Sequence, residues 1–257
     1  MAFESIVYNG APALCLTSDA GGRIVVLQRG AHLISWQDAR GVERLYLSPL
    51  SPLAGPAAVR GGVPVIFPQF GTLGVVGRHG FARTTEWQCV GHDAQSIEMA
   101  LTHTADAHAA WPHDCECRLT FTLRENALEM RLNVRNTGTS VLQFTAALHT
   151  YWALDSEASH IEGLHANGAP WALAGFQDEM IFEAPATLRI RTPDGVLHTQ
   201  TQGFRDLVVW NPGPNHGLGD LPVDGHLHYA CVEAAQLTPV VLAPGAVWTG
   251  TQHCDCA

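Results

Sequence analysis

The chain is poor in basic residues, with 14 Lys and Arg against 24 Asp and Glu, and its formal net charge is −10. Charge of this sign repels nucleic acids and anionic membrane surfaces at long range. The sequence also has no apolar run that approaches the ~20 residues needed to span a bilayer. We therefore expect no nucleic acid and no membrane partner, and any anionic ligand must be held locally by individual arginines.

Targeting and metal-binding signals are also missing. The first residues, MAFESIVYNG, lack the basic segment followed by an apolar segment that marks a secretory signal, so we expect a cytoplasmic protein. The pairs Cys115/Cys117 and Cys254/Cys256 each have one intervening residue, which is poor geometry for a mutual disulfide. Reduced thiols are the simpler interpretation. A zinc site at these CEC and CDC pairs stays open, although their spacing is unusual for zinc ligands and no HExxH motif occurs.

Short runs of alternating or β-branched residues recur along the chain, with Gly, Pro, Asn and Asp between them. This pattern is typical of antiparallel β-structure. The clearest case is the segment from Arg118 to Asn136, where the runs RLTFTL and LEMRLNV flank RENA as in a hairpin. No linker or repeat divides the 257 residues. We predict one all-β domain over residues 1–257, a large antiparallel sandwich with its function on loops and on one sheet face.

Two ionisable residues stand within apolar, strand-like segments. His149, in LHTYW, follows the apolar run FTAAL, so it should leave the end of a buried strand among aromatic residues. A lone histidine in such a place is more often structural than catalytic. Glu233 lies within HYACVEA, where alternation places it on one face with Tyr229 and Cys231. It is either at a strand end in solvent or in a cleft where partial burial raises its pKa.

The segment RGGVPVIFPQFG, residues 60–71, sets one cation against two glycines and two prolines. Proline removes a backbone donor and fixes φ, while glycine permits conformations and close approaches that a Cβ would block. The composition therefore predicts a shaped loop in place of a helix or a regular central strand. Arg60 is the residue that this loop would hold in position. The alternative is a solvated arginine at the end of a loop.

Several segments together resemble the signature segments of the bacterial hexose-6-phosphate mutarotases, the glucose-6-phosphate 1-epimerase branch of the aldose 1-epimerase group. They occur in the family's order and are RGGVPVIFPQFG, HGFAR, LHTYW, VVWNPGP and GDLPVDGHLHYACVEA. The resemblance implies a galactose-mutarotase-like β-supersandwich. It also implies interconversion of the α and β anomers of an aldohexose 6-phosphate, without a metal or an organic cofactor.

The resemblance implies roles for individual residues by their place in these motifs. His149 resembles the family's catalytic histidine, and Glu233 resembles its catalytic glutamate. The implied substrate-binding residues, two for the phosphorylated substrate and two for the sugar, are Arg60, Arg83, His79 and Asp178.

Two positions depart from the family pattern. Glu179 stands where a basic residue usually follows the aspartate, and His228 stands where a lysine is common. We therefore expect no lysine contact from this position. Arg78, beside His79, is a further candidate cation for the phosphate.

Mutarotation requires that the anomeric hydroxyl lose its proton while the ring oxygen gains one. A carboxylate and an imidazole on opposite sides of C1 and O5 supply the base and the acid. We assign Glu233 as the base and protonated His149 as the acid, with the roles reversed during ring closure. Arg60 would receive the 6-phosphate through paired hydrogen bonds, and Arg83 would close the other side. The expected partner is a small-molecule sugar phosphate, and we expect a monomer.

Two other classes of function stay open from the residues alone. A noncatalytic carbohydrate-binding protein on the same fold would keep the arginines without needing both His149 and Glu233. A glycoside hydrolase requires two carboxylates, which Asp178 and Glu233 could supply, but the arginines would then lack a purpose. Glucose, galactose and mannose 6-phosphates all stay open as substrates.

Overall fold

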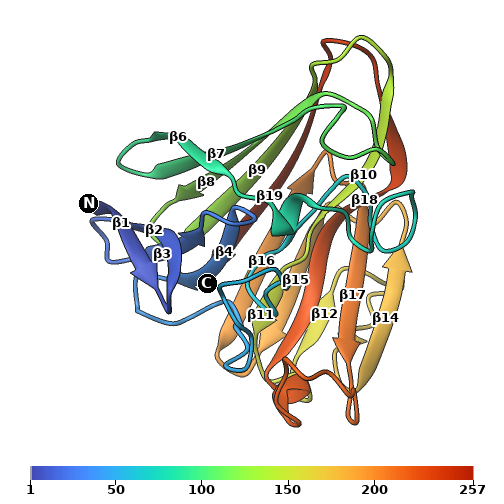
Figure 1. Ribbon diagram of the computed structural model, residues 1–257. Coiled ribbons are helices and arrows are strands. Elements are labelled where there is room, and N and C mark those ends of the chain that lie inside the picture. Colours follow the sequence, from blue (N-terminus) through green and yellow to red (C-terminus); the bar gives the residue numbers. More distant parts are fainter. Residues whose placement is uncertain (1, 257) are drawn as a thin grey trace.

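The computed structural model describes residues 2–256, which form three antiparallel sheets (Figure 1). The four-stranded sheet has the order β1-β2-β3-β4, and its strands are β1 (Ala2–Tyr8), β2 (Ala11–Thr17), β3 (Arg23–Leu27) and β4 (His32–Gln37). The six-stranded sheet has the order β14-β17-β18-β10-β5, with β11 paired to β18, and its strands are β5 (Val65–Ile66), β10 (Leu142–Leu148), β11 (Tyr151–Ala153), β14 (Phe176–Ile181), β17 (Asp206–Pro212) and β18 (Tyr229–Leu242).

The nine-stranded sheet has the order β13-β12-β15-β16-β19-β9-β8-β7-β6. Its strands are β6 (Gln88–His92), β7 (Ser96–His103), β8 (Cys115–Leu123), β9 (Ala127–Asn136), β12 (His160–Glu162), β13 (Trp171–Ala172), β15 (Thr187–Thr192), β16 (Gly195–Gln202) and β19 (Val247–Cys256). Two short 3-10 helices, η1 (Ala82–Thr84) and η2 (Gly225–Leu227), complete the elements. No helix in the described part of the chain is long and apolar enough to cross a membrane. The prediction of an all-β antiparallel fold is confirmed.

The predicted hairpin over Arg118 to Asn136 is formed by β8 and β9, which pair along their full lengths. Buried and half-exposed residues alternate along β8, as the sequence pattern requires. The thiols of the CEC and CDC pairs occupy buried positions of this sheet and belong to its core, at Cys115, Cys117, Cys254 and Cys256. Within residues 2–256, none of these thiols joins two other potential ligands at metal-binding distance. Core packing explains both pairs.

The main hydrophobic core takes side chains from all three sheets, for example Leu14 on β2, Leu132 on β9 and Val232 on β18. Burial of apolar surface contributes about 25 cal/mol per Å². Along β18, Ala230, Val232 and Ala234 turn into this core, so the alternate residues must face the other way. A slip of one residue would exchange the two faces, and the core therefore fixes which side chains β18 presents on its outer face.

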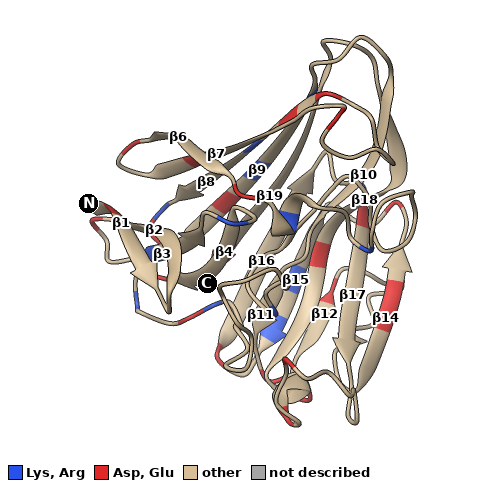
Figure 2. Ribbon diagram, viewed as in Figure 1, with Lys and Arg blue, Asp and Glu red and all other residues tan. Residues whose placement is uncertain are grey.

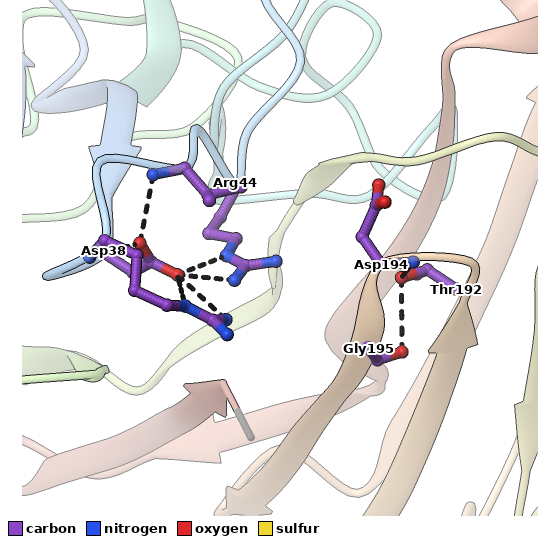
Figure 3. A network of polar contacts seen from close by, with 7 residues as sticks. Asp38, Arg44, Thr192, Asp194 and Gly195 are labelled. Atoms are coloured by element: carbon purple, nitrogen blue, oxygen red, sulfur yellow. Dashed lines mark hydrogen bonds and ion pairs between the residues drawn. The ribbon is translucent and has the colours of Figure 1, made fainter.

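A buried carboxylate fixes the turn that follows β4 (Figure 3). Asp38 accepts hydrogen bonds from Nε of Arg44 (3.1 Å), and from the backbone N–H groups of Val42 (3.0 Å) and Arg40 (2.9 Å). Burial by itself would raise the pKa of Asp38, but these donors outweigh it and lower the pKa. The chain thus leaves the four-stranded sheet in a defined direction. Figure 3 also shows the tight turn between β15 and β16, where the Thr192 hydroxyl donates to the Gly195 carbonyl.

The loop that carries Arg60 is shaped by close backbone contacts at its two glycines. Gly61 and Gly62 have φ values of +117° and +62°, and a Cβ on either would collide with a backbone carbonyl, that of Tyr46 or Leu33 respectively. The buried His32 stabilises this turn, because its Nε2–H donates a hydrogen bond to the Gly61 carbonyl at 2.7 Å. The predicted loop is confirmed, since only two residues of the segment form a strand, β5.

The buried histidine under this loop predicts how the fold responds to acid. Burial lowers the pKa of His32 to about 4, although its bond to the Gly61 carbonyl opposes the shift. In the unfolded chain the group has its ordinary pKa near 6.5 and takes up a proton first, so stability falls as the pH drops from about 6.5 toward 4. We expect His32 to account for about 2–3 kcal/mol of the stability lost between pH 7 and pH 4.5.

Urea unfolding at the two pH values measures this contribution. His32→Gln keeps a donor for the Gly61 carbonyl but does not titrate, so its loss between pH 7 and pH 4.5 should be smaller by that amount. An equal loss in both proteins would contradict the assignment.

Candidate active site

A cavity of about 460 Å³ opens on the face of the six-stranded sheet that turns away from the main core. Its lining includes Asp178 of β14 and Glu233 of β18, and Figure 2 marks acidic positions on both strands in red. The arginines of the lining are Arg60 and Arg78 in loops and Arg83 in η1. The sequence contains no lysine, so all 14 residues counted as Lys or Arg are arginines. The six residues singled out from the sequence all line this one cavity, namely Arg60, His79, Arg83, His149, Asp178 and Glu233.

Strand register brings His149 opposite Glu233. Along β18 and its neighbour, Leu148 of β10 pairs with Ala234 and Tyr151 of β11 pairs with Cys231. His149 lies in the two-residue link between β10 and β11. Because both strands pair with β18, this link runs beside Glu233. On the other side of β18, Glu233 pairs with Val208 of β17. The predicted face of Glu233 is thus correct, and the carboxyl group is fully buried.

The two groups form a close pair in a poorly solvated place. Nδ1 of His149 lies 3.3 Å from Oε1 of Glu233, and neither this nitrogen nor either carboxylate oxygen has a hydrogen-bond partner within residues 2–256. Burial, together with the nearby Asp178, raises the pKa of Glu233 well above its ordinary value. Burial also lowers the pKa of His149 well below its ordinary value, with help from His79 and the arginines.

These shifts have a clear consequence for the resting state of the pair. Burial favours the uncharged form of each group, which is a carboxylic acid at Glu233 and a neutral imidazole at His149. The arrangement inferred from the sequence, an ionised Glu233 beside a protonated His149, has the same number of protons. It differs only in which of the two groups holds the proton.

His79 is held beside the pair in a defined tautomer. The backbone N–H of Gly71 donates to Nδ1 of His79 at 3.2 Å, so the ring proton of a neutral imidazole must be on Nε2. Burial, followed by the charges of Arg83, Arg78 and Arg60, lowers the pKa of His79 to about 3. The imidazole therefore stays neutral at ordinary pH and carries one N–H donor.

Arg60 is fixed on three sides. Its Nε and Nη2 lie 3.2–3.3 Å from the carboxylate of Asp220, its Nη1 lies 3.3 Å from the Tyr151 hydroxyl, and its guanidinium carbon is 5.9 Å from the ring centroid of Trp210. Residues outside the 60–71 loop therefore fix the Arg60 side chain, and its carboxylate partner Asp220 is one that the sequence did not reveal. Asp220 lies in a loop without periodicity, so no local pattern marks it.

The other two arginines of the cavity, Arg78 and Arg83, have no carboxylate partner in the described chain. Arg83 donates from Nη2 to the carbonyl of Arg78 at 3.0 Å, and its buried Nε has no hydrogen-bond partner. In the described chain no carboxylate lies within 4.0 Å of a nitrogen of Arg78 or Arg83. Arg78 is exposed at the edge of the cavity. This side of the cavity has an excess of positive charge.

Aromatic rings complete the walls of the cavity. Tyr151 stacks on His149 with ring centroids 4.9 Å apart and an interplanar angle of 9°, and Trp210 meets His149 edge-on at 6.0 Å. The Trp210 side chain reaches this face because Trp210 pairs with Cys231 on β18 and with Asp178 on β14. By contrast, Trp152 is fully buried in the main core. These pairings depend on long-range register, which sequence reasoning could not supply.

Comparison with known proteins agrees with this geometry. The sequence profile of the Aldose 1-epimerase family matches residues 12–171, a range that includes Arg60, His79, Arg83 and His149. A protein of Escherichia coli (strain K12) is 29% identical over 232 residues, with 80% of this chain and 77% of that protein covered. One of Salmonella typhimurium (strain LT2) is 30% identical over 244 residues, with 82% and 78% covered. Each bears the name "Putative glucose-6-phosphate 1-epimerase".

Solved structures show the same fold. A crystal structure described as a "putative mutarotase" from Salmonella typhimurium superposes with a TM-score of 0.86 at 23% identity, covering 99% of this chain and 93% of that one. A galactose mutarotase related enzyme from Lactobacillus acidophilus superposes with a TM-score of 0.71 at 17% identity, covering 100% and 97%. The expectation of a galactose-mutarotase-like fold is confirmed. This chain belongs to the aldose 1-epimerase family and is an isomerase.

Proposed function

We propose that this protein interconverts the α and β anomers of a hexose 6-phosphate, D-glucose 6-phosphate first among them, by opening and closing the sugar ring. The observation that carries the proposal is the buried pair of His149 and Glu233, without other partners, in the same cavity as three arginines. The names of the two bacterial relatives support the same substrate. Neither a noncatalytic sugar-binding protein nor a glycoside hydrolase is favoured.

The chemistry needs one proton acceptor and one proton donor. Glu233 takes the proton of the anomeric hydroxyl while His149 gives a proton to the ring oxygen, and the C1–O5 bond breaks to leave an open-chain aldehyde. Rotation about the C1–C2 bond presents the other face of the carbonyl group. Closure reverses both transfers, so each group returns to its starting state and no external reactant is consumed.

The substrate itself helps to place the proton on His149. The charges of Arg83 and Arg60 contribute to the low pKa of this imidazole. A phosphate dianion bound to these arginines offsets their charge, which removes part of the penalty for protonating His149. The proton then moves from the Glu233 carboxyl to the imidazole across the 3.3 Å gap, which gives the ionised base and the protonated acid.

The phosphate is received by the positively charged side of the cavity. Arg83 and Arg78 have no carboxylate partner in the described structure, and a guanidinium group binds phosphate oxygens through paired hydrogen bonds. Arg60 contributes from its place beside Asp220. The hydroxyl groups of the sugar then face His79 and Asp178, which supply a neutral N–H donor and an acceptor.

The proton-transfer pair is tested by replacing each member. His149→Ala and Glu233→Gln should each slow anomer exchange of glucose 6-phosphate by about 10²–10⁴-fold, because each removes one positioned proton-transfer group. Two-dimensional exchange NMR on the equilibrium mixture of anomers measures the rate above the spontaneous one. Near-normal turnover in either folded variant would show that its assigned role is wrong.

Phosphate recognition is tested by comparing two substrates. Arg83→Ala and Arg60→Ala should each lower kcat/KM for glucose 6-phosphate by about 10- to 100-fold, because a charge-assisted hydrogen bond contributes about 1.5–3 kcal/mol. The slow exchange of free glucose should change much less, since glucose lacks the phosphate. Arg60→Lys should restore only part of the loss, because an ammonium group cannot form the paired bonds.

Arg124→Ala is the matched control, since Arg124 is exposed in the turn between β8 and β9. If a variant lost kcat/KM equally with glucose and with glucose 6-phosphate, the arginine would have a structural role in the site. The proposed role of that arginine in phosphate recognition would then be wrong.

The protonation of His149 is tested by ¹⁵N NMR of histidine-labelled protein, with signals assigned from His149→Ala. Without ligand, His149 should remain neutral at pH 6.5, where an ordinary histidine is half protonated. Glucose 6-phosphate should raise the pKa of this imidazole, and glucose should not. An imidazolium signal at pH 6.5 in the protein without ligand, or no response to glucose 6-phosphate, would refute the proposed proton placement.

A further inference from the structure

Cys231 lies at the proposed proton-transfer pair but takes no part in the proton transfers. It precedes Glu233 by two residues on β18 and shares its face. A ring nitrogen of His149, the thiol sulfur of Cys231 and a carboxylate oxygen of Glu233 all lie within 4.8 Å of one another, and all three residues are buried. Elsewhere in residues 2–256, no three His, Cys, Asp or Glu side chains come together in this way.

The polar atoms of this group are short of partners. Nδ1 of His149 and both carboxylate oxygens of Glu233 form no hydrogen bond with any described residue, although each is out of contact with solvent. Buried polar atoms are nearly always paired, because leaving one unpaired costs about 1–3 kcal/mol. Nδ1 of His149 and Oε1 of Glu233 contact each other at 3.3 Å without a hydrogen bond, so a ligand that contacts these atoms and the thiol together would supply the missing partners.

The donor types, and the separation of the nitrogen and oxygen donors, fit one class of ligand. Zinc binds thiolate at about 2.3 Å and imidazole nitrogen or carboxylate oxygen at about 2.0–2.2 Å, in tetrahedral geometry. Tetrahedral bonds of this length separate a nitrogen and an oxygen ligand by about 3.3–3.5 Å. Nδ1 of His149 and Oε1 of Glu233 are 3.3 Å apart. Magnesium and calcium prefer sets made only of oxygen atoms, and the thiol excludes them.

We propose that His149, Cys231 and Glu233 form a reversible Zn²⁺ site and that the bound ion inhibits the enzyme. The inhibition rests on the proposed function, whereas the binding does not. The three side chains supply three ligands of the ion, and two of them, His149 and Glu233, line the cavity that would hold the sugar. Zinc thus occupies the space and the atoms that the reaction needs.

Proton and charge balance are consistent with such binding. The thiol of Cys231 and the carboxyl of Glu233 each release a proton to solvent, and His149 binds through its neutral ring. Two anionic ligands then balance the 2+ charge of the ion, so no net charge is added to the buried site. With the ion in place, Glu233 cannot accept a proton and His149 cannot donate one.

Binding is tested without reference to activity by Co²⁺, which substitutes for Zn²⁺ and has a visible spectrum. The full-length protein is treated with EDTA, freed of chelator and titrated with Co²⁺. We expect one equivalent to bind, with a thiolate-to-cobalt charge-transfer band and the intense visible bands of a tetrahedral ion, and Zn²⁺ should displace it.

The matched variants separate this site from the other thiols. Cys231→Ser should abolish the charge-transfer band and weaken Zn²⁺ binding by at least about 10-fold, the smallest effect usual for a residue that only supports a metal ligand. Cys89→Ser is the control, because Cys89 is a half-buried thiol on β6 outside this group. Absence of the band, or a band that persists in Cys231→Ser, would overturn the site.

Anomer exchange of glucose 6-phosphate then tests the inhibition. Exchange should continue in EDTA, stop with Zn²⁺ and return when EDTA is added again. Cys231→Ser should keep the basal rate and need at least about 10-fold more Zn²⁺ for the same inhibition. Undiminished exchange by zinc-loaded protein would overturn the inhibition. A cobalt band that depends on Cys231, in a protein without exchange activity under any condition, would instead refute the proposed function and leave the metal site supported.

Discussion

The site depends on one constraint: β18 holds the carboxyl group of Glu233 in the interior of the protein. β18 is fixed by the apolar side chains of its inner face, so Glu233 has no freedom to turn toward solvent. Burial raises the pKa of Glu233, and the same environment lowers the pKa of His149 opposite it. Packing on one side of a strand thus sets the proton affinities on the other side. The proposed chemistry follows from that coupling.

The local features of the fold could be predicted because they depend on neighbouring residues alone. Alternation in HYACVEA gave the correct face for Glu233, and the two runs around residues 124–127 gave the correct hairpin. The glycines of the Arg60 loop also predicted its close backbone contacts. In each case the sequence period or the residue type determines the geometry within a few positions.

Relations between distant segments could not be derived in this way. The approach of His149 to Glu233 depends on the register of β10 and β11 against β18, and the alternation of either segment is compatible with several registers. The contact between Asp220 and Arg60 was harder still to predict from the sequence. The place of Asp220 beside Arg60 is set partly by the hydrogen bond from the Ser48 hydroxyl to the Asp220 carbonyl, a contact between segments far apart in the chain. Family resemblance supplied candidate residues, but not this ion pair.

The absence of lysine has a further chemical consequence. The proposed reaction passes through an open-chain aldehyde, and aldehydes condense with primary amines to form imines. A guanidinium group stays protonated and does not react in this way, whereas a lysine in a cavity of this kind can lose its proton and become a nucleophile. The cavity binds anions through Arg60, Arg78 and Arg83, and no lysine occurs anywhere in the sequence. The protein therefore presents no side-chain amine with which a released sugar aldehyde could glycate it.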